Sequence, residues 1–169
     1  MIRRLIADRR GVATVEFALV LPVILAAQFA LGEFMQAYQA QRRVSHVAAA
    51  MADITAQNRT VSDAELDEIM EAGLTIIRPF PTDGLGRRIS SLSANSTGAV
   101  TVHWSLNRGY PSGTPPSVPA GYLAPGESVV VTDVAYDYRP DFGLFLAGGF
   151  RFERHAYVRP RLSDRVTRR

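Results

Sequence analysis

Cysteine is absent from this chain of 169 residues, and its absence excludes three kinds of chemistry. The chain can form no disulfide framework, no thiolate nucleophile and no zinc site built on cysteine. The same absence leaves the cellular compartment open, because exported domains can be stable without disulfides.

Signs of nucleic-acid binding are also missing, although the formal net charge is +3. The first eleven residues hold four arginines and one aspartate, which give this segment a formal charge of +3 by themselves. The rest of the chain is therefore neutral, and the basic character belongs to an N-terminal leader. No RNA- or DNA-binding pattern interleaves with the arginines, so we expect no nucleic-acid partner.

Recognisable catalytic and metal-binding patterns are lacking as well. No nucleophile elbow, P-loop or dinucleotide fingerprint is present. The three histidines, His46, His103 and His155, are isolated in sequence and do not have the spacing of a metal site. Asp141–Gly143 copies a kinase tripeptide, but the other kinase motifs are missing and the chain is too short. We therefore expect no enzyme, no cofactor and no metal.

One long apolar run is present, from Val12 to Leu31, and its only polar side chains are Thr14, Glu16 and Gln28. Twenty helical residues span about 30 Å, which is the thickness of the hydrocarbon core of a bilayer. The arginines precede the run, so the positive-inside rule puts the N-terminus in the cytoplasm and the rest of the chain outside it. The sequence thus predicts a single-pass membrane protein.

Two residues within the run bear on the structure or function of a membrane helix. A carboxylate near the bilayer core, as at Glu16, costs roughly 2.5–3.5 kcal/mol on insertion scales, so it suggests a function. Pro22 removes one helical hydrogen bond and crowds the preceding turn, which predicts a helix kink near Val20 and Leu21.

The apolar run follows a basic leader that ends in Gly11, and Glu16 comes five residues after this glycine. The segment from Gly11 to Pro22 reads Gly-x4-Glu-Phe-Ala-Leu-x-Leu-Pro. This pattern resembles a type IV prepilin processing site. In this variant it is similar to the TadE/TadG-like minor pilins, or pseudopilins, of tight-adherence (Flp) pilus systems. Phe17 in place of tyrosine, together with the length of the chain, favours the TadE-like branch over the major Flp pilin.

The resemblance implies an assembly subunit with three parts. Residues 1–11 would be a leader that a prepilin peptidase removes between Gly11 and Val12. Residues 12–33 would be the transmembrane helix in the bacterial inner membrane, and residues 34–169 a periplasmic head. Glu16 and Phe17 would pair with neighbouring subunits in the membrane. The partners implied are other pilin or pseudopilin subunits, the peptidase and the pilus assembly platform, and the mature subunit could leave the bilayer for the pilus.

Other interpretations compete with this one. A cleaved secretory signal peptide would have an apolar region of about 7–15 residues, which is shorter than this run. The small residues Ala26 and Ala27 also form no clean A-x-A cleavage site. An uncleaved membrane-anchored binding or adhesion module is the main alternative. A membrane-anchored hydrolase is a third, for which the sequence offers no nucleophile and base.

The beginning of the head, residues 34–78, is predicted to be helical. The first helix should continue to about Ala56, since apolar residues recur at helical spacing on one face. A second helix should begin at Ser62, where Ser62 and Glu65 fit a capping box. Gly73 and Pro79 bracket its end.

Strands are predicted within residues 87–158. The expected strands are Ile89–Ala94, which is the weaker one, Val100–Leu106, which alternates as a half-buried strand, Val129–Tyr138 and Phe150–Val158. The first two would be joined by a hairpin turn at 95–98. The segment 107–128 is rich in proline and glycine and is expected to be a structureless crossover.

The predicted fold class is α+β: a long N-terminal transmembrane and amphipathic helix packed on a small, mostly antiparallel sheet head, as in pilins. The C-terminal Arg159-Pro160-Arg161 resembles the ending of many TadE/TadG-like chains. Taken alone, it would be a basic, solvated tail.

Overall fold

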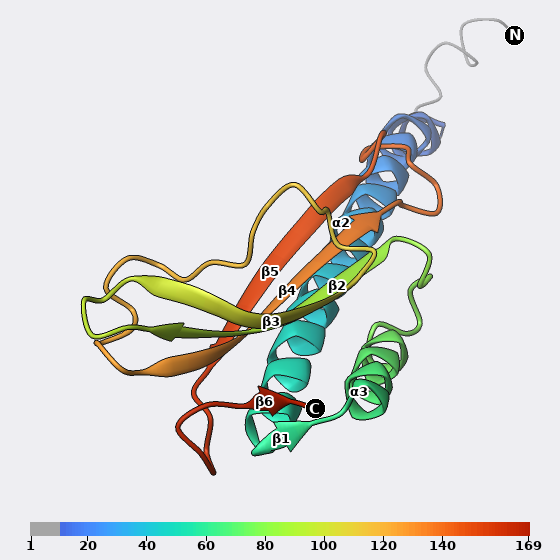
Figure 1. The fold of residues 1–169 in the computed structure, drawn as a ribbon. Helices are drawn as coiled ribbons and strands as arrows, with labels where there is room; N and C mark the ends of the chain where they lie inside the picture. Colours follow the sequence, from blue (N-terminus) through green and yellow to red (C-terminus); the bar gives the residue numbers. More distant parts are fainter. Residues whose placement is uncertain (1–10) are drawn as a thin grey trace, which may run out of the picture.

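The computed structural model describes residues 11–169, which form one long helix with an α+β head on its second half (Figure 1). Helix α2 runs from Val12 to Ala56, and helix α3 runs from Asp63 to Ile76. The predicted end of the first helix at Ala56 is confirmed. The predicted leader, apart from Gly11, lies outside the described residues.

Four antiparallel strands form the main sheet in the order β3-β2-β4-β5. Their bounds are Leu85–Ala94 for β2, Val100–Arg108 for β3, Ser128–Tyr138 for β4 and Phe150–Val158 for β5. A parallel pair, β1 at Thr60–Val61 and β6 at Thr167–Arg168, joins the two ends of the head and was not predicted. The predicted α+β class, a long N-terminal helix on a small antiparallel sheet, is confirmed.

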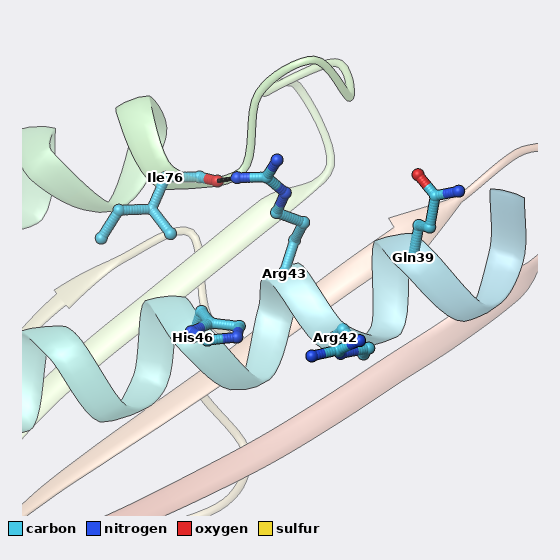
Figure 2. A pocket seen from close by; sticks show the side chains of 5 residues that line it. All are labelled: Gln39, Arg42, Arg43, His46 and Ile76. Atoms are coloured by element: carbon cyan, nitrogen blue, oxygen red, sulfur yellow. Dashed lines mark hydrogen bonds between the residues drawn. The ribbon is translucent and has the colours of Figure 1, made fainter.

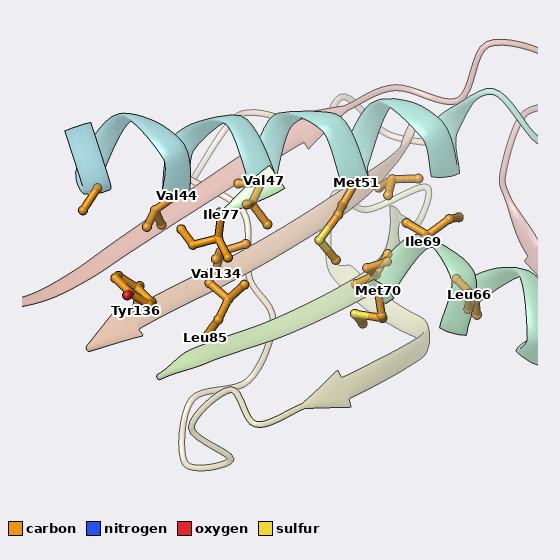
Figure 3. Close-up of a cluster of buried hydrophobic side chains, with 14 of the residues drawn as sticks. Val44, Val47, Met51, Leu66, Ile69, Met70, Ile77, Leu85, Val134 and Tyr136 are labelled. Carbon is orange, nitrogen blue, oxygen red and sulfur yellow. The ribbon is translucent and has the colours of Figure 1, made fainter. Parts of the chain in front are cut away.

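The main core lies between one face of this sheet and the two helices (Figure 3). Helix α2 crosses β4 and β5, and α3 packs beside α2. From Ala37 onward α2 buries a residue at nearly every third or fourth position, which is the spacing of one helix face. The largest fully buried side chains of the two helices are Val44, Val47, Met51, Leu66 and Met70.

The helix starts and turns of the head follow their local sequence signals. The capping box at α3 forms: the Glu65 amide donates to the Ser62 hydroxyl at 3.3 Å, and the Ser62 amide donates to the Glu65 carboxylate at 2.7 Å. The predicted hairpin turn also forms, with the side-chain oxygen of Asn95 accepting from the amides of Thr97 and Ala99, each at 2.9 Å.

The strand predicted to be weaker is instead one of the two central strands of the sheet. β2 begins at Leu85, earlier than predicted, and it pairs with both β3 and β4. Its polar residues misled the prediction, because each has a partner that is distant in sequence. Arg87 donates to the Met70 carbonyl, Ser90 bonds Ser105 at 2.8 Å, and Ser91 donates to the Val166 carbonyl at 3.2 Å.

The strand predicted at Val100–Leu106 exists, but its expected half-burial holds only for its second part. Trp104 and Leu106 pack against the main core, whereas Val100 and Val102 stay 43% and 46% exposed. The reason is that β3 is the edge strand farthest from β5, so α2 does not cover its beginning.

Candidate functional site

The N-terminal half of α2 is an apolar rod that the head does not cover. Val12 is the first helical residue, and the helix continues without interruption through Pro22. The apolar part of α2 is long enough and apolar enough to cross a membrane, and none of it is buried in the protein. Its large side chains stand open, as at Leu19 (71% exposed) and Val23 (67%). A surface of this kind is stable only against lipid or another apolar surface.

The predicted cleavage site lies at the first turn of this rod. Gly11 is the N-cap residue with φ −87°, and a side chain there would meet nothing within 4 Å. The amide of Val15 donates to the Gly11 carbonyl at 3.1 Å, which is the first bond of the helix. The fold gives no steric reason for glycine at position 11. Gly32, at the other end of the rod, is in equally open space, and the fold does not explain it either.

The two predicted pairing residues lie on the exposed rod. Glu16 begins the second turn of the helix, and Phe17 beside it is 61% exposed. Val12 is 50% exposed, and it precedes Glu16 by four residues, or about 6 Å along the helix axis. The structure thus leaves Val12, Glu16 and Phe17 accessible to a neighbouring molecule.

A second glutamate, which the sequence analysis did not single out, lies where the rod meets the head. Glu33 is only 3% exposed. Its carboxylate accepts hydrogen bonds from three consecutive backbone amides, those of Leu144 at 2.8 Å and of Phe145 and Leu146 at 3.0 Å. A polar residue directly after the apolar run was the only sequence signal. Its partners are more than a hundred residues away, so the pattern could not name them.

The segment that Glu33 binds, residues 139–149, connects β4 and β5 and lies against α2 at the end of the head nearest the N-terminus (Figure 1). Gly149 ends the segment with φ +72°, and a side chain there would overlap the carbonyl of Tyr138. The kinase-like tripeptide 141–143 is therefore part of a tight structural connection.

Further polar side chains of α2 line an open cleft of about 360 Å³ beside α3. Figure 2 shows the side chains that line it, which are Gln39, Arg42, Arg43, His46 and Ile76. Arg43 donates to the carbonyl of Ile76 at 3.3 Å, so it links the two helices. Within residues 11–169, no group of three acidic, histidine or cysteine side chains could hold a metal ion.

A buried ion network lies on the opposite face of the sheet. Asp133 is 2% exposed and accepts from Arg88, with 2.6 Å between the carboxylate and the guanidinium, and from His155 at 2.7 Å. The Arg88 guanidinium also lies 4.5 Å from the centre of the Tyr110 ring. Burial raises the pKa of the Tyr110 hydroxyl. The network fixes β2 to β4 and holds the segment that follows β3.

Apart from its two ends, the proline- and glycine-rich segment has no helix or strand, as predicted, but it packs against the sheet. Strands β3 and β4 extend into its two ends, which leaves residues 109–127 between them. Tyr110 and Leu123 are buried, and Leu123 belongs to a smaller core with Leu92, Val129 and Val131. The segment is thus packed on the sheet, and nothing in its geometry favours a binding role.

The C-terminal basic residues are exposed, but they are bound to the rest of the head. Arg161 donates to the Ala56 carbonyl through its amide at 3.0 Å and forms an ion pair with Asp53. Arg168 lies 2.6 Å from Asp63, and its hydrogen bond holds the pKa of that carboxyl below its usual value. The chain end therefore ties the end of α2 to the start of α3.

Comparison with known families identifies the exposed rod and its continuation into the head. Residues 11–53 match the family model described as TadE-like protein. This segment of the chain is TadE-like. The match covers about a quarter of the sequence and includes Gly11, Glu16, Pro22 and Glu33, but no strand of the sheet.

The match relates residues 11–53 to the Tad, or tight-adherence, pilus system. Within the described residues 11–169 there is one candidate membrane helix, near the N-terminus, which fits a membrane-anchored component of that system. No curated protein and no solved structure matches the chain.

Proposed function

We propose that this TadE-like chain is a minor pilin or pseudopilin subunit, which a prepilin peptidase processes and which then assembles through its N-terminal helix. The observation that carries the proposal is the contrast within α2: the family match spans a helix whose first half is bare and apolar, while its second half anchors a folded head. A helix of this kind can pass from lipid into a helical bundle without refolding the head.

Cleavage is proposed between Gly11 and Val12. The geometry of the helix start supports this position, because the bond lies at the boundary of α2 and Gly11 adds no side chain beside it. A peptidase needs an extended backbone, and opening the chain here breaks only the first bond of the helix, from the Val15 amide to the Gly11 carbonyl.

Determining the N-terminus of the protein extracted from membranes tests the cleavage. We expect Val12 as the first residue, and we expect Gly11→Val to leave a precursor that is heavier by the leader. A native chain that begins at Met1, or near Gln28 as after a signal peptidase, would refute the pilin function. In the first case the uncleaved membrane-anchored module would be the better description.

Pairing between Glu16 of one subunit and the new amino group of Val12 of its neighbour is proposed as the assembly contact. Cleavage creates a cation whose reference pKa is about 7.7–8.0, next to the bilayer edge. A subunit staggered by about one helical turn would bring that amine beside the Glu16 carboxylate, and Phe17 would pack alongside. Buried charges are tolerated when they are paired, which favours the assembled state.

Glu16→Ala should insert and be cleaved normally, yet fail to co-purify with the other pilin subunits. Thr14→Ala, a polar-to-apolar change two residues earlier on the same exposed part of the helix, is the matched control and should assemble normally. Full piliation with Glu16→Ala would show that the pairing does not drive assembly.

The head is proposed to be periplasmic and to have no catalytic activity of its own. The topology rests on the arginines before the apolar run, and it is tested by fusing reporters after Arg169. A reporter that is active only outside the cytoplasm should give signal, and a reporter that is active only in the cytoplasm should not.

A further inference from the structure

We propose that the β4–β5 connection is a membrane-contacting loop, which Glu33 holds at the surface of the bilayer that α2 crosses. The proposal rests on α2 spanning the membrane, as in the proposed function. The partner is the surface of the bilayer from which the head projects. The contact area, called here the junction patch, consists of five side chains: Phe34, Phe142, Leu144, Phe145 and Phe150.

The junction patch is unusual because its large apolar side chains are exposed although the core lies close by. Phe142 is 70% exposed, Leu144 64% and Phe34 58%. An apolar groove of about 220 Å³ continues the patch between α2 and β5, where Phe34, Phe150 and Leu146 are among its lining residues. A cluster of this size facing water would be unfavourable, so a covering surface is expected.

The position of the patch along α2 selects the bilayer as that surface. The apolar run ends at Leu31, and Glu33 follows about 3 Å farther along the axis. Glu33 binds the amides of Leu144, Phe145 and Leu146 directly, so the loop lies level with the end of the run. The patch is therefore continuous with the surface of α2 that crosses the membrane. Phe and Leu side chains can insert at this depth, at the boundary between the headgroups and the acyl chains.

Glu33 also explains how the loop keeps its apolar side chains outward. Three consecutive amides converge on one carboxylate, so their backbone polarity is satisfied internally rather than by water. Hydrogen bonds to an ionised acceptor are roughly twice as strong as neutral ones. With the backbone fixed in this way, Leu144 and Phe145 direct their side chains away from the core. The Phe145 side chain accordingly remains 48% exposed.

Nitroxide labels attached to single cysteines can measure the depth of the loop, since the natural chain has no cysteine to remove. The full-length chain would be reconstituted in vesicles of phosphatidylethanolamine and phosphatidylglycerol, with Phe142→Cys or Leu144→Cys in the patch. Val20→Cys reports the membrane span, and Ser96→Cys, in the β2–β3 turn, reports the water-exposed head. Collision with oxygen, which partitions into lipid, is compared with collision with a water-soluble nickel chelate.

We expect the labels at 142 and 144, like the label at 20, to collide more with oxygen than with the nickel chelate, although they should lie at a shallower depth. The label at 96 should collide more with the nickel chelate. Adding Glu33→Ala should move the loop labels toward nickel and increase their mobility, while the label at 20 remains unchanged.

Loop labels that favour nickel while position 20 favours oxygen would overturn this inference and leave the membrane span intact. A label at 20 that favours nickel would instead overturn the membrane span on which both proposals rest. Loop labels shielded from both reagents, with shielding that disappears when the protein is diluted in lipid, would show that a second copy of the chain covers the patch, and would also overturn the inference.

Discussion

The two halves of α2 share one continuous helix but differ in what surrounds them. Val20 and Val23 in the first half are 51% and 67% exposed, whereas Val44 and Val47 in the second half are completely buried. Side-chain type does not distinguish these four positions, so the difference comes from the sheet, which covers only the second half. The first half therefore leaves its apolar surface available for lipid or neighbouring helices, while the second half contributes to the stability of the head.

The largest expected effect comes from placing the same charge in each half. Met51→Asp would bury an unpaired carboxylate in the main core and should lower the free energy of unfolding by more than about 4 kcal/mol. Val23→Asp should leave head stability unchanged and instead oppose membrane insertion, by roughly 2.5–3.5 kcal/mol.

Urea unfolding of the full chain in detergent, followed by the fluorescence of the single tryptophan, Trp104, measures the first effect. Membrane fractionation measures the second. Equal destabilisation of the head by both substitutions would mean that the two halves of α2 are not independent.

A smaller effect contrasts a buried ion pair of the head with an exposed one. Asp133→Ala leaves Arg88 buried without its carboxylate and should cost about 3–5 kcal/mol. Asp137 faces solvent and lies 3.3 Å from Arg151, so Asp137→Ala should cost no more than about 1 kcal/mol. The same urea titration compares them, and similar costs would show that the Arg88 network is not needed for stability.

Two glycines extend the comparison between the packed head and the bare rod. A methyl group at Gly86 would overlap the carbonyl of Gly109 and approach the Cα of Tyr110 to 2.8 Å. Gly86→Ala should therefore destabilise the head by about 1–3 kcal/mol. Gly11→Ala has open space around it and should leave the unfolding midpoint unchanged. A stable Gly86→Ala variant would mean that β2 and the segment after β3 can separate at little cost.

The smallest effect concerns the cap of α3. Ser62→Ala should cost about 1 kcal/mol, which is typical for the loss of an N-cap hydroxyl. A hydrogen bond from the Ser62 amide, and a second from the Ser62 hydroxyl, hold the pKa of Glu65 below its ordinary value of 4.5. A lowered folded-state pKa means that Glu65 stabilises the head above pH 4.5 and that this contribution is lost as the pH falls through the folded-state value.

Thermal unfolding measured between pH 3 and pH 7 checks this contribution. Glu65→Gln should remove part of the decrease in stability at acidic pH. An unchanged pH profile in Glu65→Gln would show that the carboxylate of the capping box does not contribute to the pH dependence.

Local sequence patterns were sufficient for the elements whose cause lies within a few residues. The apolar run, the helical spacing up to Ala56, the capping box at Ser62 and the turn at Asn95 each depend on neighbours in the chain, and each forms as predicted. The Gly11–Pro22 pattern likewise indicated the TadE-like match at residues 11–53, because it occupies one continuous segment. These features are local, so a single sequence can specify them.

Features that depend on distant partners were decided only by the tertiary structure. The polar strand β2 became central because Met70, Ser105 and Val166 satisfy its side chains. The basic chain end connects the end of α2 to the start of α3 because β6 pairs with β1. Glu33 binds the β4–β5 connection because β4 and β5 pack on α2 and place that connection beside the helix. In each case a polar group that appears solvated in the sequence finds a partner far away in the chain. Arg87, Ser91 and Glu33 are buried with theirs, since burial requires such a partner and only the fold can supply it.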